Sequence, residues 1–373
     1  MESEEESGAQ LGEEIIDALL KKAKETDGNK SNDLIEVSVE PAEDQDDILL
    51  TIPEREFSRL AEETSASFGL KTPFVKITFD NKALDTIAET ESSGDIRILA
   101  NKDLDQDGRP VYDVKVKKGE AAVEDLQGGK AFVTAPYQAK PEENENAIVV
   151  YGIDEDGSRK IMRGRYDSEQ ESMVFRTGYF YKFVVAHNLV EYDDVEDTSW
   201  YKDSIEFIAA REITQGIDEN NFGPQHNLTR AQFVVLLLNA YQVETAGAEE
   251  LDTDNFADVG ETYYTDHLLT AKALGIVKGV GNNEFAPERE ITRQEMFVIL
   301  YNVLQLIDEM PEEVNANELA HYFDADAIAE WAEGAAAALI KTGTIEGYAN
   351  KLMPQATSTR AEMAQVIYNL QTR

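Results

Sequence analysis

The chain of 373 residues contains no cysteine. Disulfide bonds, thiolate metal sites and cysteine nucleophiles are therefore excluded. Basic residues are few beside acidic ones: 34 lysines and arginines stand against 74 aspartates and glutamates, and the net charge is −40. Nucleic acid is not an expected partner, because binding to phosphate groups requires a basic surface.

Long apolar runs are also lacking. No stretch approaches the roughly 18 apolar residues that suggest a transmembrane helix, so we expect no membrane span. The opening sequence "MESEEESGAQ" has neither the basic nor the apolar region of a signal peptide. We therefore expect either a cytoplasmic protein or a mature or excised part of an exported protein, whose export signal is not in this chain.

Common catalytic motifs are absent as well. There is no G-x-S-x-G elbow, P-loop or dinucleotide fingerprint, and the four histidines lack zinc-site spacing. The segment "DLDQDG" begins like a calcium loop through Asp103, Asp105 and Asp107, but its twelfth position is Val114 instead of glutamate. A hairpin turn is the preferred interpretation and a weak calcium site the alternative. We expect no enzyme activity and no cofactor.

The first half of the chain shows alternation of apolar and polar residues. Residues 1–33 form an acidic lead with a short amphipathic helix, "LGEEIIDALLKKAKE". Between 34 and 188, runs such as "IEVSVE", "VKITFD" and "YDVKVK" have the period of two that is typical of half-buried antiparallel strands. Two short helices are predicted at "EREFSRLAEE" and "DNKALDTIAE". We interpret residues 34–188 as one or two mainly-β modules of the immunoglobulin-like sandwich type.

The second half contains an internal repeat. The phrases "LTRAQF", "ITRQEM" and "STRAEM" recur, with their arginines 63 and 67 residues apart. Before each phrase come a turn, "FGP", "FAP" or "LMP", then further upstream a glycine, an aromatic residue and an aspartate. This predicts three all-α copies of helix, loop and helix, at 189–245, 251–308 and 318–373.

Each repeated phrase predicts a helix start. The threonine is an N-cap candidate, and the residue three positions later is Gln or Glu, which forms a capping box. The pairs are Thr229 with Gln232, Thr292 with Glu295, and Thr359 with Glu362. An arginine at the first helical position is unfavourable by about 0.3–1 kcal/mol, because it meets the positive end of the helix dipole. Three such arginines suggest a carboxylate ligand held by the guanidinium and free helix amides, or else salt bridges to acids of the neighbouring repeat.

This pattern resembles the S-layer homology (SLH) domain family over about half of the chain. The resemblance implies a three-repeat bundle with a pseudo-threefold arrangement and grooves between adjacent repeats. It also implies non-covalent anchoring of an exported protein to the secondary cell-wall polysaccharide of a Gram-positive-type bacterium, commonly through a pyruvylated sugar. Residues that would bind the glycan are Arg230, Arg293, Arg360, Trp200, Tyr264, Trp331, Asp194, Asp258, Asp324, Gly216, Gly279 and Gly347.

The arginines would contact the pyruvyl carboxylate, whereas the other positions keep alternatives. The aromatic residues are expected either to stack on sugar or to pack in the core. The glycines either allow a loop to approach the sugar or serve a turn with positive φ. The aspartates either cap the first helix of each repeat or accept bonds from sugar hydroxyls.

Three functions follow as hypotheses. The first is a surface protein whose SLH repeats bind the wall and whose β region is a spacer or partner-binding module. The β region itself resembles sequences found before SLH repeats in clostridial and bacillar surface proteins, through phrases such as "KTPFVKITFDNKALDTIA". The second is a self-associating S-layer lattice protein. The third is a wall-bound fragment of a glycan hydrolase.

Overall fold

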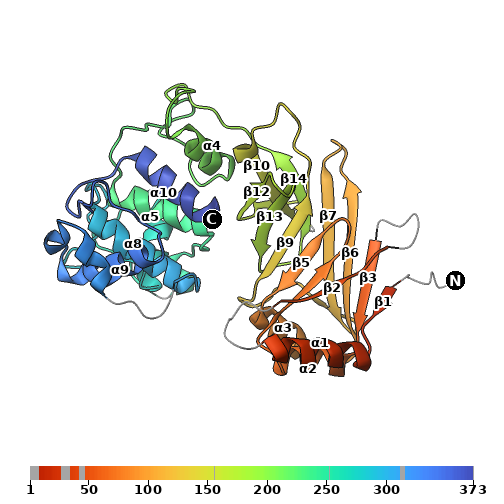
Figure 1. Ribbon diagram of the computed structural model, residues 1–373. Helices are drawn as coiled ribbons and strands as arrows, with labels where there is room; N and C mark the ends of the chain where they lie inside the picture. Colours follow the sequence, from red (N-terminus) through yellow and green to blue (C-terminus); the bar gives the residue numbers. More distant parts are fainter. Residues whose placement is uncertain are drawn as a thin grey trace. The chain divides into compact units, whose positions relative to one another are not determined.

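The computed structural model describes residues 8–26, 34–41, 47–154, 156–251, 253–310 and 316–372. The chain divides into two compact units, Met1–Asn188 and Leu189–Arg373, and each is described by itself (Figure 1). Within the described segments, no helix has both the length and the apolar character needed to cross a bilayer.

The first unit is built on two sheets. The larger, eight-stranded sheet has the order β1-β3-β6-β7-β14-β10-β11, with β8 also paired to β7, and the six-stranded sheet has the order β12-β13-β9-β5-β4-β2. The strands of the larger sheet are β1 (Gly8–Gln10), β3 (Asp47–Ile52), β6 (Ile96–Leu104), β7 (Pro110–Lys118), β8 (Ala121–Val123), β10 (Ile148–Ile153), β11 (Arg159–Ile161) and β14 (Lys182–His187). Those of the smaller sheet are β2 (Leu34–Ser38), β4 (Ser67–Lys71), β5 (Lys76–Phe79), β9 (Ala131–Pro136), β12 (Gly164–Asp167) and β13 (Ser172–Thr177).

Alternation along the strands places one side of each sheet in a shared core. Ile77, Phe79, Val114 and Val116 are at most 1% exposed, as their period of two predicts. The mainly-β prediction is confirmed, whereas immunoglobulin-like connectivity stays a prediction. The antiparallel expectation is wrong for β2, which runs parallel to β4, and β1 likewise runs parallel to β3.

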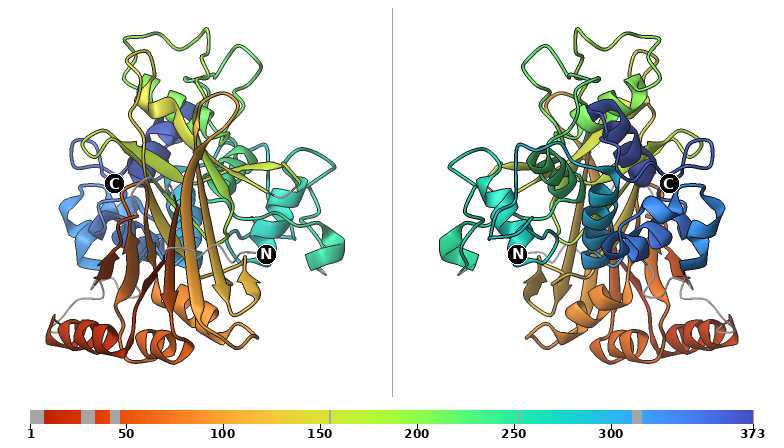
Figure 2. Two further views of the ribbon diagram at one scale, coloured as in Figure 1. Left: turned by 90° about the vertical axis from the view of Figure 1, so that its right-hand side faces the viewer. Right: turned by 90° about the vertical axis from the view of Figure 1, so that its left-hand side faces the viewer.

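Three helices lie at one end of these strands, α1 (Glu13–Thr26), α2 (Glu54–Glu62) and α3 (Asn81–Glu89), and both views of Figure 2 keep them there. A 3-10 turn, η1 (Glu145–Ala147), precedes β10. The two helices predicted after the lead are confirmed as α2 and α3. The helix of the acidic lead is α1, and its Ile16 and Leu20 are 0% and 2% exposed in the β-unit core. The rest of the lead, 1–7 and 27–33, lies outside the described residues.

The "DLDQDG" segment forms the hairpin turn between β6 and β7, as predicted, with Leu104 paired to Pro110. Asp105 accepts the amides of Asp107 and Arg109, and its Oδ2 lies 2.6 Å from Arg109 Nε. Arg109 also lies 3.0 Å from the Asp107 carboxylate. Arg109 thus provides the positive charge beside the aspartates of this turn. No cluster of three His, Cys, Asp or Glu side chains suited to a metal ion occurs among the described residues.

The second unit consists of helices joined by loops. Its elements are α4 (Lys202–Ala210), α5 (Arg230–Tyr241), α6 (Ala248–Leu251), α7 (Thr265–Ala273), α8 (Arg293–Leu306), η2 (Ala316–His321), η3 (Ala325–Ala327), α9 (Glu330–Lys341) and α10 (Arg360–Thr372). The predicted helix-loop-helix copies are confirmed. The helix that follows Thr-Arg in each repeat packs against the first helix of the next repeat: α5 against α7, α8 against α9, and α10 against α4.

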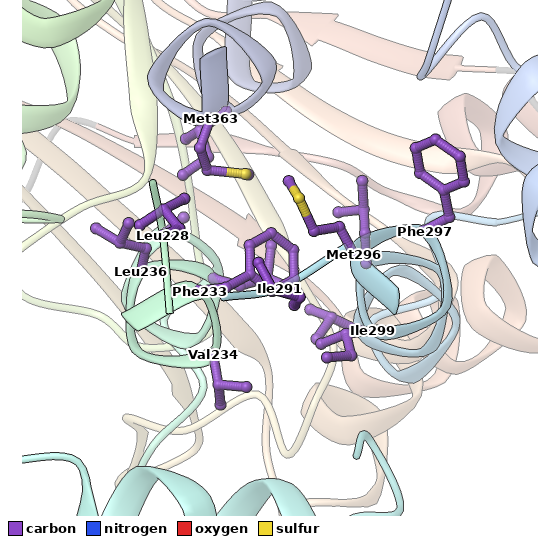
Figure 3. Packing of buried hydrophobic residues seen from close by; sticks show 14 of the residues in the cluster. Leu228, Phe233, Val234, Leu236, Ile291, Met296, Phe297, Ile299 and Met363 are labelled. Carbon is purple, nitrogen blue, oxygen red and sulfur yellow. The ribbon is translucent and has the colours of Figure 1, made fainter. Parts of the chain in front are cut away.

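The core of this unit lies where α5, α8 and α10 meet. Phe233, Met296 and Met363 occupy the same position in the three copies, and Figure 3 shows their side chains converging. Buried residues surround α5 on all sides, since Val234 and Leu236 are buried as well as Phe233. A helix that is apolar on all sides belongs inside a core.

Candidate functional site

The three Thr-Arg phrases begin α5, α8 and α10, and the predicted threonine caps are confirmed. At α5, the Thr229 hydroxyl accepts the Gln232 amide at 3.2 Å, and the Gln232 side chain accepts the Thr229 amide at 3.1 Å. The same two bonds start α10. At α8, Glu295 accepts both the amide and the hydroxyl of Thr292 at 2.9 Å.

The next amides of these helices bond to a neighbouring repeat. Arg230 N–H donates to Arg289 O, and Ala231 N–H donates to Pro287 O, both in the second repeat. The start of α8 bonds in the same way to the loop of the third repeat, and the start of α10 to the loop of the first. These bonds close a ring of three repeats. They also correct an expectation, because helix amides that we took to be free for an anion already have partners.

Each repeated arginine reaches across the same boundary. Its Nε donates to the carbonyl of the first residue in the "FGP", "FAP" or "LMP" turn of the following repeat. The bonds join Arg230 to Phe285 (2.9 Å), Arg293 to Leu352 (2.8 Å) and Arg360 to Phe222 (2.8 Å). The first task of these arginines is therefore to fasten one repeat to the next.

The three guanidinium groups differ in their remaining partners. Arg230 forms an ion pair with Glu295 at 2.7 Å, and the side chains of the two are only 5% and 15% exposed. Arg360 donates to the Thr214 hydroxyl at 3.2 Å. Arg293 is half-buried, and no hydrogen bond or ion pair joins its terminal nitrogens to another described residue. Burial lowers the pKa of all three arginines, which nevertheless remain charged because guanidinium groups start far above neutrality.

The aspartates of the repeats hold the turns that the arginines contact. Each carboxylate accepts two successive backbone amides within its own repeat, at 2.7–2.9 Å. The bonds run from Asp194 to Phe222 and Gly223, from Asp258 to Phe285 and Ala286, and from Asp324 to Leu352 and Met353. The aspartates therefore hold loop backbone and do not cap the first helix of each repeat, whereas their contact with sugar hydroxyls stays a prediction.

The three glycines lie where the loop backbone crosses an aromatic ring. A Cβ atom on Gly347 would lie 2.5 Å from both Lys351 O and the Tyr322 ring, and equivalent carbonyl and ring contacts surround Gly216 and Gly279. Only Gly216 has positive φ, at 74°. The positive-φ interpretation is therefore wrong for Gly279 and Gly347, where close approach within the protein excludes a side chain.

The predicted aromatic residues of the three repeats differ in their exposure to solvent. Trp200 and Trp331 are 62% and 58% exposed, but Tyr264 is only 7% exposed and donates to Glu288 at 2.7 Å. The residue equivalent to the tryptophans is Tyr263, which is 65% exposed. Counting back from the glycine of each repeat finds it, because Trp200, Tyr263 and Trp331 all lie 16 positions before that glycine.

Two of the three repeated arginines line grooves between repeats. The Arg230 groove, about 930 Å³, is lined by Arg230 of the first repeat, Gly279 and Glu295 of the second, and Trp331 of the third. The Arg293 groove, about 270 Å³, is lined by Arg293 of the second repeat and by the 343–346 loop and α10 of the third. The Arg230 groove thus collects a cation, a loop and an exposed ring from three different repeats.

Residues 191–234, 255–297 and 322–364 match the sequence profile of the S-layer homology domain. The second unit is therefore a set of three S-layer homology repeats. Domains of this family anchor surface proteins to the cell wall and bind its polysaccharide.

Curated relatives extend this assignment. The chain is similar to an amylopullulanase of Thermoanaerobacterium thermosulfurigenes (24% identity over 83% of this chain and 16% of the relative). It is also similar to the exoglucanase XynX of Acetivibrio thermocellus (33% over 50% and 17%) and to a surface-layer 125 kDa protein of Lysinibacillus sphaericus (29% over 49% and 15%). The chain spans about a sixth of the length of these relatives. The first match covers more of the chain than the helical unit alone and so extends into the β unit.

Proposed function

We propose that this chain anchors an exported protein to the wall of a Gram-positive-type bacterium by binding a pyruvylated secondary cell-wall polysaccharide. The SLH repeats, in a pseudo-threefold arrangement, hold the glycan in grooves between neighbouring repeats. The β unit acts as a spacer or a partner-binding module outside the wall. The chain itself is a binding module without catalytic activity.

The observation that carries this proposal is that two grooves between the repeats are each lined by one repeated arginine and by apolar side chains. In the Arg230 groove the exposed Trp331 ring offers a flat apolar face, and in the Arg293 groove the terminal guanidinium nitrogens have no hydrogen-bond or ion-pair partner among the described residues. Sugars pair hydroxyl groups with apolar faces, so a ring beside polar groups suits them. The carboxylate of a pyruvate ketal is the group that a guanidinium prefers.

Binding to purified sacculi tests the proposal. We expect the chain to sediment with intact sacculi and to stay in solution once acid extraction has removed the secondary polymer. A Trp200→Ala and Trp331→Ala double variant should bind at least about tenfold more weakly, because each ring provides an anchoring contact. These exposed rings are better targets than the arginines, whose Nε bonds hold the repeats together. Equal sedimentation before and after extraction would refute the proposed ligand.

A lattice-forming role is a second candidate, because the surface-layer protein of L. sphaericus shares 29% identity with half of this chain. In that case the β unit would self-associate. Light scattering at rising calcium concentration separates the two functions: the anchor should remain monomeric, and a lattice protein should form large particles.

A fragment of a glycan hydrolase is the third candidate, since an amylopullulanase and an exoglucanase are among the relatives. We expect no release of reducing sugar from wall or plant polysaccharides, because this chain spans only 16–17% of those relatives. Release of reducing sugar by the purified chain would contradict the binding-module assignment.

A further inference from the structure

The three repeated arginines are equivalent in sequence, but they differ in how many terminal guanidinium donors are already bonded within the protein. We propose that the Arg293 groove is the carboxylate-binding groove of this chain, and that Glu295 prevents the Arg230 groove from binding a second carboxylate. This inference rests on the proposed function and specifies which part of the bundle recognises the acidic sugar.

The Arg230 groove already contains a carboxylate. Glu295 Oε1 lies 2.7 Å from Arg230 Nη1 and also accepts a bond from Arg289 at 2.5 Å. Its other oxygen caps α8 through the Thr292 amide. A sugar carboxylate entering here would have to displace a buried acid that has three partners, so this groove is suited to neutral sugar.

The Arg293 groove lacks such a pair. In this groove, Glu362 is the residue equivalent to Glu295. It accepts the Thr359 amide at 2.8 Å and forms no ion pair with Arg293 within the described part of the chain. The terminal nitrogens of Arg293 therefore keep their donors for a guest. The turn that Arg293 contacts has Leu352 in place of phenylalanine, and Arg293 lies over its own Phe297 ring at 5.6 Å. Arg230 and Arg360 instead lie over Phe285 and Phe222, at 4.4 and 4.7 Å.

A second, independent feature marks the same groove. Ser358 is 1% exposed, lines the groove, and its hydroxyl has no hydrogen-bond partner among the described residues. The corresponding residues of the other repeats are Leu228 and Ile291, which fill the core. A buried hydroxyl without a hydrogen-bond partner is unfavourable unless a ligand or a water molecule forms a hydrogen bond with it. Arg293 and Ser358 together offer donors to one carboxylate, and Met296 and Phe297 line the groove with apolar surface for the ketal methyl group.

Acidic neighbours limit where the ligand can sit. Glu346 and Glu362 line the same groove and would repel a carboxylate placed beside them. The negative charge of Glu362 also acts on Arg293, so the carboxylate of the sugar must contact the side of that guanidinium that faces away from Glu362.

Calorimetric titration with a methyl glycoside of N-acetylmannosamine carrying a pyruvate ketal tests the inference. The unmodified chain should bind one ketal, because Glu295 pairs with Arg230, and because Arg360 is only 5% exposed and donates to Thr214. The same glycoside without the ketal should bind at least about tenfold more weakly. Arg293→Lys should weaken binding by about tenfold or more, since a lysine cannot form the two parallel bonds of an arginine. Ser358→Ala should weaken it by a few fold.

Glu295→Gln provides the decisive gain of function. Gln232 occupies the same position in α5 and forms a complete capping box there, so this substitution preserves the helix start. It removes the carboxylate that Arg230 shares with Arg289, and the number of ketals bound should rise from one to two. Glu261→Gln, an exposed position in the same repeat, is the matched control and should leave the number at one.

The outcomes separate this inference from the proposed function. Ketal binding that survives Arg293→Lys, or binding of two or three ketals by the unmodified chain, would overturn the inference and leave the anchoring function standing. Binding to sacculi without any affinity for the ketal would overturn both the pyruvylated ligand and the assignment of the Arg293 groove. Unchanged stoichiometry in Glu295→Gln, with thermal stability retained, would overturn the role of Glu295.

Discussion

Replacing one repeat aspartate should loosen the turn on which the neighbouring arginine depends. Asp258 accepts the amides of Phe285 and Ala286 at 2.8 and 2.7 Å, and the carbonyl of Phe285 in turn accepts the Arg230 Nε bond. In Asp258→Ala both amides lose a charged acceptor. The Phe285 amide belongs to a residue that is 0% exposed, so water replaces its partner poorly, whereas the Ala286 amide can reach solvent.

The expected magnitude follows from these two bonds. A hydrogen bond to a charged group contributes about 1.5–3 kcal/mol, and an unsatisfied buried amide costs about as much. Counting the Phe285 amide in full and the Ala286 amide in part, we expect Asp258→Ala to lower the free energy of unfolding by about 3 kcal/mol. For a unit of this size, that corresponds to a fall in Tm of roughly 10 °C. Asp258→Asn, which keeps one acceptor oxygen, should lose about half as much.

Urea unfolding followed by tryptophan fluorescence is the assay. Both tryptophans of the chain, Trp200 and Trp331, lie in the helical unit, so the signal reports on that unit. Glu261→Ala is the control for loss of an acid at an exposed position. Asp194→Ala and Asp324→Ala should behave like Asp258→Ala, because their carboxylates make the same pair of bonds. An unfolding midpoint equal to that of the control would refute the reasoning.

Three further changes test other parts of the helical unit. Ser358→Val should raise the free energy of unfolding by about 1 kcal/mol in a thermal melt, because it removes an unpartnered buried hydroxyl and fills space beside the core. Gly347→Ala should lower the free energy of unfolding by about 2–4 kcal/mol, because the new methyl group would overlap a backbone carbonyl. Gly334→Ala is the control: no atom lies within 4 Å of the added Cβ, so this variant should be neutral or stabilising in the same thermal melt. Burial lowers the pKa of His267 from its ordinary value of 6.5, so the folded state favours the neutral ring. The free energy of unfolding, measured with urea, should therefore decrease as pH falls below 6.5. His267→Gln should weaken this pH dependence, and an unchanged pH dependence would contradict the role given to His267.

Features set by local sequence were predicted well. The threonine caps, the helix starts and the alternation of buried residues along β5 and β7 depend on neighbours within a few positions, and the structure confirms them. The ring of repeats brings together groups far apart in the chain. Arg360 bonds to Phe222, 138 positions away, and no local pattern identifies that partner.

The errors at the site have a common origin in loop length. Counting forward from Asp258 reaches the buried Tyr264, because the segment between aspartate and helix differs in length among the repeats. Counting back from Gly279 crosses a helix of constant length and reaches the exposed Tyr263. The parallel pairing of β2 with β4 was missed for a related reason, since alternation reports which face of a strand is buried and not the direction of its neighbour.

An arginine at the first position of a helix interacts unfavourably with the helix dipole. In each of the three repeats, a hydrogen bond of the arginine side chain offsets this cost. The Nε–H of each arginine bonds to a carbonyl that an aspartate-held turn presents from the next repeat. This bond uses one of five donors, so the same side chain can close the ring and still face a groove with its terminal nitrogens. Whether those nitrogens remain available depends on their neighbours: Glu295 pairs with Arg230, Thr214 accepts a bond from Arg360, and no described residue bonds to the terminal nitrogens of Arg293. Because all three arginines make the same Nε bond, the partners of their terminal nitrogens decide which one can bind an acid from outside, and Arg293 is the one that we assign to this role.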